Sequence, residues 1–234
     1  HAGQHSQCSR IGRAAVREAL NMGTPHKWAL AAFQVLAVLG ILACGVDAAV
    51  IRFVHRSLTP TLDDFFDAVS ELANATILSI ATLCTYGASR VAQAWPAARR
   101  WLPWWEHVKQ GSLLMLLTLL MGGLITLALK HVVARARPSV LIELGHYGFA
   151  TPFAGHPFNS FPSSHAFTAF AAACVLAYLL PAWRTPLLVL AVIASFCRVL
   201  TLEHFPSDVL ASAFIAAGCV RFLAPRLQDP LSRN

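Results

Sequence analysis

The chain is organised around three polar stretches: KHVVARARP (residues 130–138), FPSSH (residues 161–165) and CRVLTLEHFPSD (residues 197–208). Each stretch lies at the end of a strongly apolar segment, and together they hold cations, histidines and a carboxylate. Charged groups at the ends of membrane spans are costly to place there. The three stretches therefore indicate a functional site before they indicate a solvated surface.

The composition indicates an integral membrane protein. Of the 234 residues, 56% are hydrophobic and 12% are charged, and the mean hydropathy is +0.58. A soluble domain this apolar would be unusual. The formal charge of +7 could indicate a nucleic-acid partner, but the Lys and Arg residues lie between apolar runs rather than on one basic face. We therefore interpret them as topology signals and site residues, and expect no nucleic acid.

Apolar runs of this kind predict an all-α bundle of six transmembrane helices. The predicted spans are residues 28–50, 65–87, 112–129, 165–180, 187–200 and 206–223. One domain, 28–223, then lies between a polar N-terminal segment, 1–27, and a short tail, 224–234. Signal peptides also begin with basic residues, but bulky Leu42 disfavours cleavage before Cys44. Gly122 and Gly123 in the third span are expected to permit close helix packing.

The segments between the spans carry further signals. Asp63, Asp67 and Glu71 recur at every fourth position, which we interpret as the solvated end of the second helix. Tryptophans mixed with Arg and Pro at 95–105 predict a connector in the headgroup layer. The long connection 139–161 contains five Tyr and Phe residues and few charges. We expect it to rest in the membrane interface and to leave a lateral opening for a lipid.

The distribution of basic residues predicts the orientation. Six spans place both termini on one side, whose segments hold 12 Lys and Arg residues against 6 on the opposite side. The positive-inside rule then places the termini in the cytoplasm and all three polar stretches at the outer face.

The spacing of the cations predicts an anion site. Lys130 and Arg137 are seven residues apart, two helical turns, so we expect them to share one helical face that Pro138 ends. Arg198 ends the fifth span. Three cations at one membrane face match a phosphate, whose oxygens suit a guanidinium fork.

Histidines accompany these cations. Ser163 and Ser164 precede a predicted helix, so their N–H groups and hydroxyls can point at the same anion, with His165 in the first turn. His204 and Asp208 are one turn apart, and the carboxylate can fix the tautomer of a nucleophilic imidazole. Taken singly, the cations could be headgroup anchors, the serines an N-cap, and the last pair a helix-end interaction. Their order, spacing and common membrane face favour one site.

On these motifs the chain resembles the type 2 phosphatidic acid phosphatase superfamily, which shares its site with vanadium haloperoxidases. The family pattern is K-x6-R-P, then P-S-G-H, then S-R-x5-H-x3-D. The matching residues are Lys130, Arg137, Pro138, Pro162, Ser163, His165, Arg198, His204 and Asp208. Ser164 replaces the glycine of the second motif, and Cys197 replaces the serine of the third motif. We expect Ser164 to keep its N–H, provided that its backbone does not need φ > 0.

The resemblance implies a role for each residue. His204 is the nucleophile that forms a phosphohistidine, Asp208 orients it, and His165 protonates the leaving oxygen. The phosphoryl oxygens are held by Lys130, Arg137, Ser163, Ser164 and Arg198. No carboxylate cluster suits a two-metal site, so we expect neither a metal nor another cofactor.

The sequence therefore predicts a lipid phosphatase of a bacterial inner (plasma) membrane, with its site on the periplasmic or extracellular side. The resemblance implies four candidate substrates: a polyprenyl diphosphate, phosphatidylglycerol phosphate, phosphatidic acid and the phosphate of a lipid A-type glycolipid. A phosphotransferase that passes the phosphoryl group to a second lipid, or a catalytically silent lipid-binding protein, are the alternatives.

Overall fold

The computed structural model describes residues 34–57, 60–71, 74–95 and 100–228, without the side chains of 44, 60–63 and 228. The chain divides into two units, His1–Ile41 and Leu42–Asn234. Of the first unit, residues 34–41 are described, and they are helical. The architecture below is that of the second unit. The predicted boundaries at residues 27 and 223 stay a prediction.

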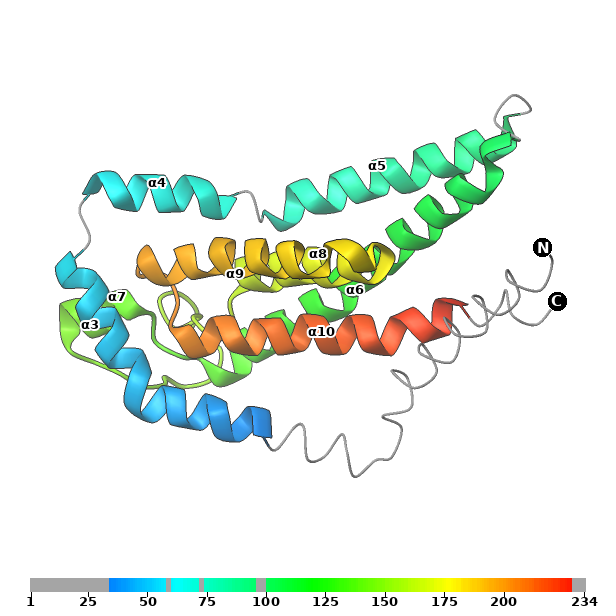
Figure 1. Ribbon diagram of the computed structural model, residues 1–234. Helices are drawn as coiled ribbons and strands as arrows, with labels where there is room; N and C mark the ends of the chain where they lie inside the picture. Colours follow the sequence, from blue (N-terminus) through cyan, green and yellow to red (C-terminus); the bar gives the residue numbers. More distant parts are fainter. Residues whose placement is uncertain (1–33, 58–59, 72–73, 96–99, 229–234) are drawn as a thin grey trace. The chain divides into compact units, whose positions relative to one another are not determined.

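The regular secondary-structure elements in the described part of the second unit are all helices (Figure 1). Its elements are a π-helical turn η1 (Leu42–Val46), α3 (Asp47–Ser57), α4 (Pro60–Glu71), α5 (Ala75–Ala94), α6 (Leu102–Val133), α7 (Pro138–Leu144), α8 (Ser164–Leu179), a 3₁₀ turn η3 (Pro181–Trp183), α9 (Arg184–Leu200) and α10 (Pro206–Gln228). The predicted all-α class is confirmed.

The structure contains four stretches long and apolar enough to cross a membrane: Asp64–Ala94, which includes the undescribed residues 72–73, and Leu102–Val133, Pro181–Leu200 and Pro206–Leu227. The protein is therefore an integral membrane protein. Helix α8 is as apolar but has 16 residues, which at 1.5 Å per residue is about 24 Å, less than the roughly 30 Å of a hydrocarbon core. The first predicted span begins outside the described residues, so the count of six spans stays a prediction.

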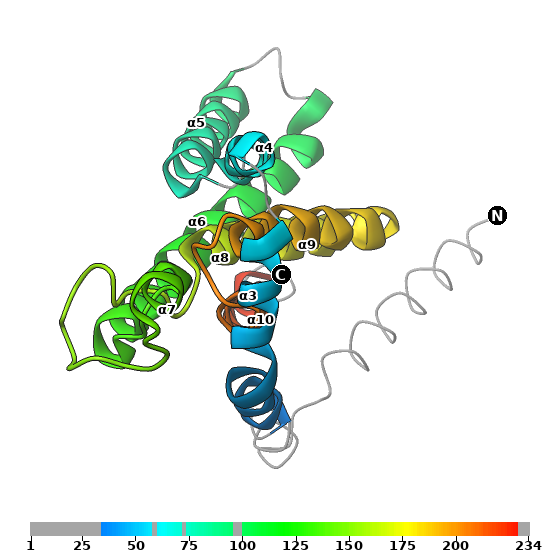
Figure 2. The ribbon, with the colours of Figure 1, turned by 90° about the vertical axis from the view of Figure 1, so that its left-hand side faces the viewer.

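The second predicted span, 65–87, lies within the candidate stretch Asp64–Ala94, but it belongs to two helices rather than one, α4 and α5. Asn74 caps a new helix there: its side chain accepts hydrogen bonds from the N–H groups of Thr76 and Ile77, at 2.9 and 3.3 Å. The acidic half forms α4, which packs against α9, and the apolar half forms α5, which packs along α6 (Figures 1 and 2). An Asn N-cap favours the start of a new helix at this point, because its side-chain oxygen satisfies backbone N–H groups that a continuous helix would bond internally.

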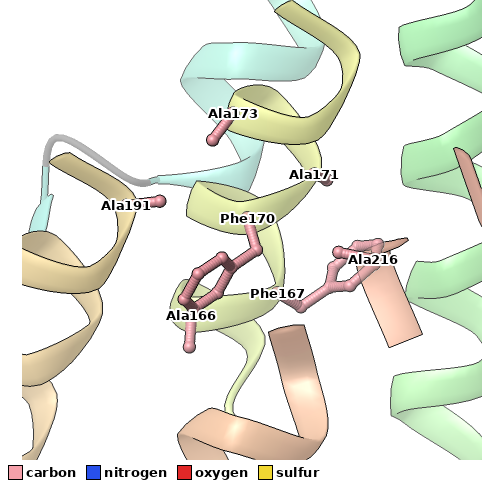
Figure 3. Packing of buried hydrophobic residues seen from close by; sticks show 7 residues of the cluster. All are labelled: Ala166, Phe167, Phe170, Ala171, Ala173, Ala191 and Ala216. Atoms are coloured by element: carbon pink, nitrogen blue, oxygen red, sulfur yellow. The ribbon is translucent and has the colours of Figure 1, made fainter. Parts of the chain in front are cut away.

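The core lies where α6, α8, α9 and α10 pack against one another. Its alanines let the helices approach closely, while Phe167 and Phe170 fill the space between them (Figure 3). A Cβ added at Gly122 of α6 would lie 2.3 Å from the Phe167 ring, whereas one at Gly123 would meet open space. Close packing at the glycine pair is confirmed for Gly122 and not for Gly123.

Candidate active site

The first motif leaves its helix earlier than predicted. Helix α6 ends at Val133, and Ala134 adopts the left-handed conformation (φ 46°, ψ 49°) while its N–H bonds to the carbonyl of Lys130. Pro138 begins α7 and disfavours helical backbone at the residue before it, so Arg137 is extended (φ −76°, ψ 160°). The prediction that Lys130 and Arg137 share one helical face was therefore wrong.

Residues 134–137 cross between the two helices as an extended segment. They are bonded to the loop after α7 through four backbone hydrogen bonds: Ala150 to Ala134, Ala136 to Gly148, Arg137 to Pro157 and Ser160 to Arg135. The loop in turn brings Asn159 to both cations. Lys130 Nζ donates to the Asn159 carbonyl at 2.7 Å, and Arg137 Nε donates to Asn159 Oδ1 at 2.9 Å. The loop, rather than a shared helical face, therefore joins the two side chains.

The third predicted cation lies beside the second. Arg137 Nη1 pairs with the carboxylate of Glu203, and Arg198 Nη2 lies 3.5 Å from the same oxygen. Arg198 Nη1 also donates to Asp67 Oδ1 at 2.9 Å and to Ser70 Oγ at 3.0 Å. One carboxylate oxygen thus lies between two guanidinium groups, the environment that a phosphate oxygen requires.

The serine motif begins helix α8 as predicted. Ser163 is the N-cap, and its buried hydroxyl accepts the N–H of Ala166 at 3.3 Å. Ser164 is the first helical residue and has no positive φ, so the condition for replacing glycine is met. His165 follows in the first turn, with Nε2 3.4 Å from Glu71 Oε1. A helix N-terminus here presents N–H groups and partial positive charge.

Asp67 and Glu71 had been interpreted as a solvated helix end. Both carboxylates are exposed, as that interpretation requires, but each also contacts a predicted site residue, Arg198 and His165 respectively. The sequence spacing placed them on one face of α4 without revealing what that face meets.

The third motif places both groups of the predicted nucleophile pair in the interior. His204 and Asp208 are 2% and 0% exposed. Nδ1 of His204 lies 3.8 Å from Asp208 Oδ2, beyond hydrogen-bond distance, and has no hydrogen-bond partner among the described residues. Asp208 Oδ2 instead accepts from Ser160 Oγ at 2.6 Å and from the Phe205 N–H at 2.9 Å. The carboxylate thus faces the ring while capping the start of α10.

Arg135, which is not among the predicted site residues, lies at the centre of this buried region. Its Nη1 donates to Asp208 Oδ1 at 2.6 Å and its Nη2 donates to Asp47 Oδ2 at 2.7 Å. The guanidinium also lies over the Phe205 ring, 4.3 Å from the centroid, and donates to the hydroxyl of Tyr147 at 2.8 Å. An aromatic of the loop predicted to lie at the interface is therefore turned inward, while Phe149 and Phe153 are exposed.

Burial and neighbouring charges shift the pKa values of His204, Arg137 and Arg135. Burial lowers the pKa of His204 to about 4, with Lys130 and Arg137 acting in the same direction and Asp208 opposing them. The imidazole is therefore neutral at neutral pH and carries a lone pair. Burial and then Arg198 lower the pKa of Arg137. Burial also lowers the pKa of Arg135, but Asp208 and Asp47 outweigh it and raise that pKa above its ordinary value.

Two signals could have found the missed residues. Asp47 falls inside the predicted first span, and a carboxylate at such a position indicates a site by default. Arg135 belongs to the first motif itself, two residues before Arg137. Asn159 and Glu203 carried no such signal, because nothing in their local sequence indicates which cations they meet.

The arrangement can bind an anion and transfer a group from it. Three cations and a helix N-terminus gather beside a neutral histidine that has a carboxylate behind it, and a second histidine lies on the helix N-terminus. Among the described residues, no three His, Cys, Asp or Glu side chains are grouped as ligands for one metal ion.

Comparisons with known proteins identify the family of the chain. The profile of the PAP2 superfamily matches residues 111–230, which include all three motifs. Lipid A 1-phosphatases of Rhizobium etli and Rhizobium johnstonii are 39% and 38% identical over 95 and 101 residues. These alignments cover 40% and 43% of this chain and 40% and 41% of the relatives, so the chain matches about two fifths of each relative's length.

Solved structures share the fold. A transmembrane PAP2-type phosphatidylglycerolphosphate phosphatase from Bacillus subtilis has a TM-score of 0.58 at 20% identity, covering 86% of this chain and 97% of that one. LpxE of Aquifex aeolicus has a TM-score of 0.53 at 20% identity, covering 77% of this chain and 96% of that one. The superfamily profile spans just over half of the 234 residues, and the protein belongs to the PAP2 superfamily.

Proposed function

We propose that the protein is a lipid phosphatase that transfers a phosphoryl group to His204 and then to water. The observation that carries the proposal is the carboxylate oxygen of Glu203 between Arg137 and Arg198, because an anionic oxygen of substrate phosphate would fit the same two guanidinium groups. Lys130 lies beside them through Asn159.

The first step is an attack by Nε2 of His204 on phosphorus. The bond from phosphorus to the lipid oxygen breaks, and His165 gives that oxygen a proton. The cations hold the remaining phosphoryl oxygens and stabilise the charge that spreads over them in the transition state. Ser163 and Ser164 contribute through the start of α8.

The second step is an attack by water on the phosphohistidine. His165, now unprotonated, takes a proton from the water, the bond between Nε2 and phosphorus breaks, and inorganic phosphate leaves. Asp208 orients His204 throughout. Because the cations supply the charge stabilisation that a metal would otherwise give, the reaction needs no metal ion.

Among the candidate substrates, the phosphate of a lipid A-type glycolipid is supported most directly, since two relatives are lipid A 1-phosphatases. A polyprenyl diphosphate, phosphatidylglycerol phosphate and phosphatidic acid are the other candidates. The lipid chain contributes binding free energy, about 0.8 kcal/mol for each buried CH₂. We expect its removal to lower kcat/KM by about a hundredfold or more.

The test is phosphate release from these four lipids by purified protein in mixed micelles, with and without EDTA. Wild-type protein should release phosphate from at least one lipid and ignore EDTA, and rapid quenching should trap an acid-labile phosphoenzyme. His204→Ala should abolish both signals, and Asp208→Asn should leave residual turnover. His107→Ala, near the opposite end of α6, is the matched control.

Other outcomes favour other readings. Transfer of phosphate to an added acceptor lipid would identify a phosphotransferase, and binding without release would identify a catalytically silent lipid-binding protein. Wild-type turnover by His204→Ala, or loss with EDTA that Mg²⁺ restores, would contradict the mechanism.

A further inference from the structure

We propose that Asp47 and Arg135 are positioning residues that hold Asp208 ionised and aimed at His204, so that the N-terminal part of the second unit completes the catalytic pair. The inference rests on the proposed function for its meaning in catalysis. Its geometric content, the control of the His204 ring by a distant carboxylate, can be tested without turnover.

The contacts form a chain of buried groups. Arg135 bridges two carboxylates with different nitrogens, Asp208 through Nη1 and Asp47 through Nη2. Asp47 also accepts the N–H of Ser207 at 3.1 Å and the Ser207 hydroxyl. Asp47 and Asp208 are each 0% exposed, and Arg135 is 4% exposed. Each carboxylate is therefore paired and hydrogen-bonded, as burial of charge requires.

The bridge fixes how the Asp208 carboxylate is turned. Arg135 holds Oδ1, and this leaves Oδ2 on the side of the His204 ring, 3.8 Å from Nδ1. A small movement that shortens the distance between Nδ1 and Oδ2 would let Nδ1–H donate a hydrogen bond to Oδ2. The lone pair then lies on Nε2, where it is available for attack. Without the bridge, the hydrogen bonds from Ser160 and the Phe205 N–H to Oδ2 remain, but the buried carboxyl loses its charged partner. It then favours its neutral form, which is a weaker acceptor for Nδ1–H.

The charges explain why a second carboxylate is present. Asp208 with Arg135 alone would be neutral, and an ion pair already satisfied by a guanidinium is a weak acceptor for a histidine. Asp47 makes the buried trio of two carboxylates and one guanidinium carry one net negative charge. That negative charge stabilises the positive charge that develops on the imidazole when Nε2 attacks phosphorus.

An irregular helical turn precedes Asp47 and positions its side chain. Asp47 directly follows the π-helical turn η1, and such single turns interrupt α-helices frequently at functional sites. The hydroxyl of Tyr147 bonds to the carbonyl of Ala43 within that turn and accepts a hydrogen bond from Arg135. The irregular turn thus supplies one acceptor to the network and places Asp47 against the guanidinium.

A contribution to folding stability does not by itself explain why Asp47 and Arg135 are buried here. Replacing buried ion networks by apolar side chains of similar volume is often neutral or stabilising. Asp208 also already accepts hydrogen bonds from the Ser160 hydroxyl and from the Phe205 N–H at the start of α10. A role in stability would be independent of Asp208, whereas a positioning role must act through it.

The experiment compares wild type, Asp47→Asn, Asp208→Asn and the double variant at neutral pH. Nitrogen-15 NMR of histidine-labelled protein, with the His204 signals assigned from His204→Gln, measures the share of the Nδ1–H tautomer. The charged groups that face His204 are Asp208, Lys130 and Arg137, and all are kept in Asp47→Asn. We expect Asp47→Asn to lower the Nδ1–H share and kcat by about tenfold, with KM changed less than twofold.

The double variant separates positioning from folding. In the Asp208→Asn background, Asp47→Asn should change neither the tautomer nor kcat further. Glu106→Gln, which makes the same carboxylate-to-amide change outside this network, where Glu106 pairs with Lys109, should leave the tautomer share unchanged and alter kcat by less than about threefold. If Asp47→Asn does not fold, Arg135→Lys takes its place, because a single ammonium cannot hold both carboxylates with two nitrogens.

An unchanged tautomer in folded Asp47→Asn or Arg135→Lys would overturn the proposal. So would a loss of kcat that persists in full in the Asp208→Asn background. Failure of the wild-type protein to release phosphate from any lipid would instead contradict the proposed function, while the NMR comparison would still decide the geometric claim.

Discussion

The carboxylate of Glu203 occupies the position where we expect a substrate phosphate oxygen to bind. Its carboxylate lies between Arg137 and Arg198, so phosphate must displace it or share the cations with it. Because Glu203 is partly exposed, it can swing away at modest cost. Replacing it removes a competitor of like charge.

We therefore predict that Glu203→Gln binds phosphate more tightly. The inhibition constant of inorganic phosphate should fall about threefold to tenfold, a difference of about 0.7 to 1.4 kcal/mol. Competitive inhibition of lipid phosphate hydrolysis measures it. Glu106→Gln, which makes the same charge change near the other end of α6, should leave the constant unchanged. Weaker inhibition in Glu203→Gln would mean that the carboxylate assists binding by orienting the two arginines.

The lowered pKa of His204 predicts how the free energy of unfolding depends on pH. Its pKa is about 4 in the folded protein and about 6.5 in an unfolded chain. The unfolded state therefore binds the proton first, and stability contributed above pH 6.5 is lost as the pH falls towards 4. The full loss would be about 3 kcal/mol.

The corresponding measurement compares thermal unfolding of wild type and His204→Gln in detergent between pH 7 and pH 4. The wild-type Tm should fall more steeply than that of the variant, which lacks the titrating group. Parallel curves would show that His204 is not buried as a neutral ring.

At the scale of elements, α6 contacts α8 and α10 through a glycine that has no room for a side chain. A Cβ at Gly122 would meet the buried ring of Phe167 at 2.3 Å and Cys219 Sγ at 3.2 Å. Overpacking of this kind costs about 1–3 kcal/mol. The neighbouring Gly123 faces open space, and replacing a helical glycine by alanine gains up to about 1 kcal/mol.

We predict opposite results for two adjacent substitutions. Gly122→Ala should lower the Tm of the purified protein, while Gly123→Ala should leave it unchanged or raise it. The pair is its own control, since both variants add one methyl group to the same helix. Equal Tm values for the two variants would contradict the close contact between α6 and α8.

At the scale of the whole molecule, the orientation in the membrane stays a prediction from the count of 12 basic residues against 6. With the six native cysteines replaced, a cysteine at exposed Phe153 should react with an impermeant thiol reagent in intact cells. A cysteine at exposed Trp101 should react only after the membrane is opened. The reverse labelling would place the site on the cytoplasmic side and change the lipids that can reach it.

The sequence by itself determined the class of protein, the helical fold and the motif residues. Composition indicated a membrane protein. Local signals set the start of α8 at Ser163 and Ser164 and the start of α10 at Pro206. These features depend on residues that are neighbours in the chain, so spacing and capping rules can recognise them.

The tertiary structure decided how the motif residues are held. Arg135 meets Asp47 across 88 residues, and Ser207 meets Asp47 across 160. Lys130 and Arg137 meet at Asn159 rather than on one helix. Local rules describe a few turns of chain and carry no information on which distant polar group will satisfy a buried charge. That choice is made when the helices pack, because a charge removed from water must then find its partner among the groups that packing brings within reach.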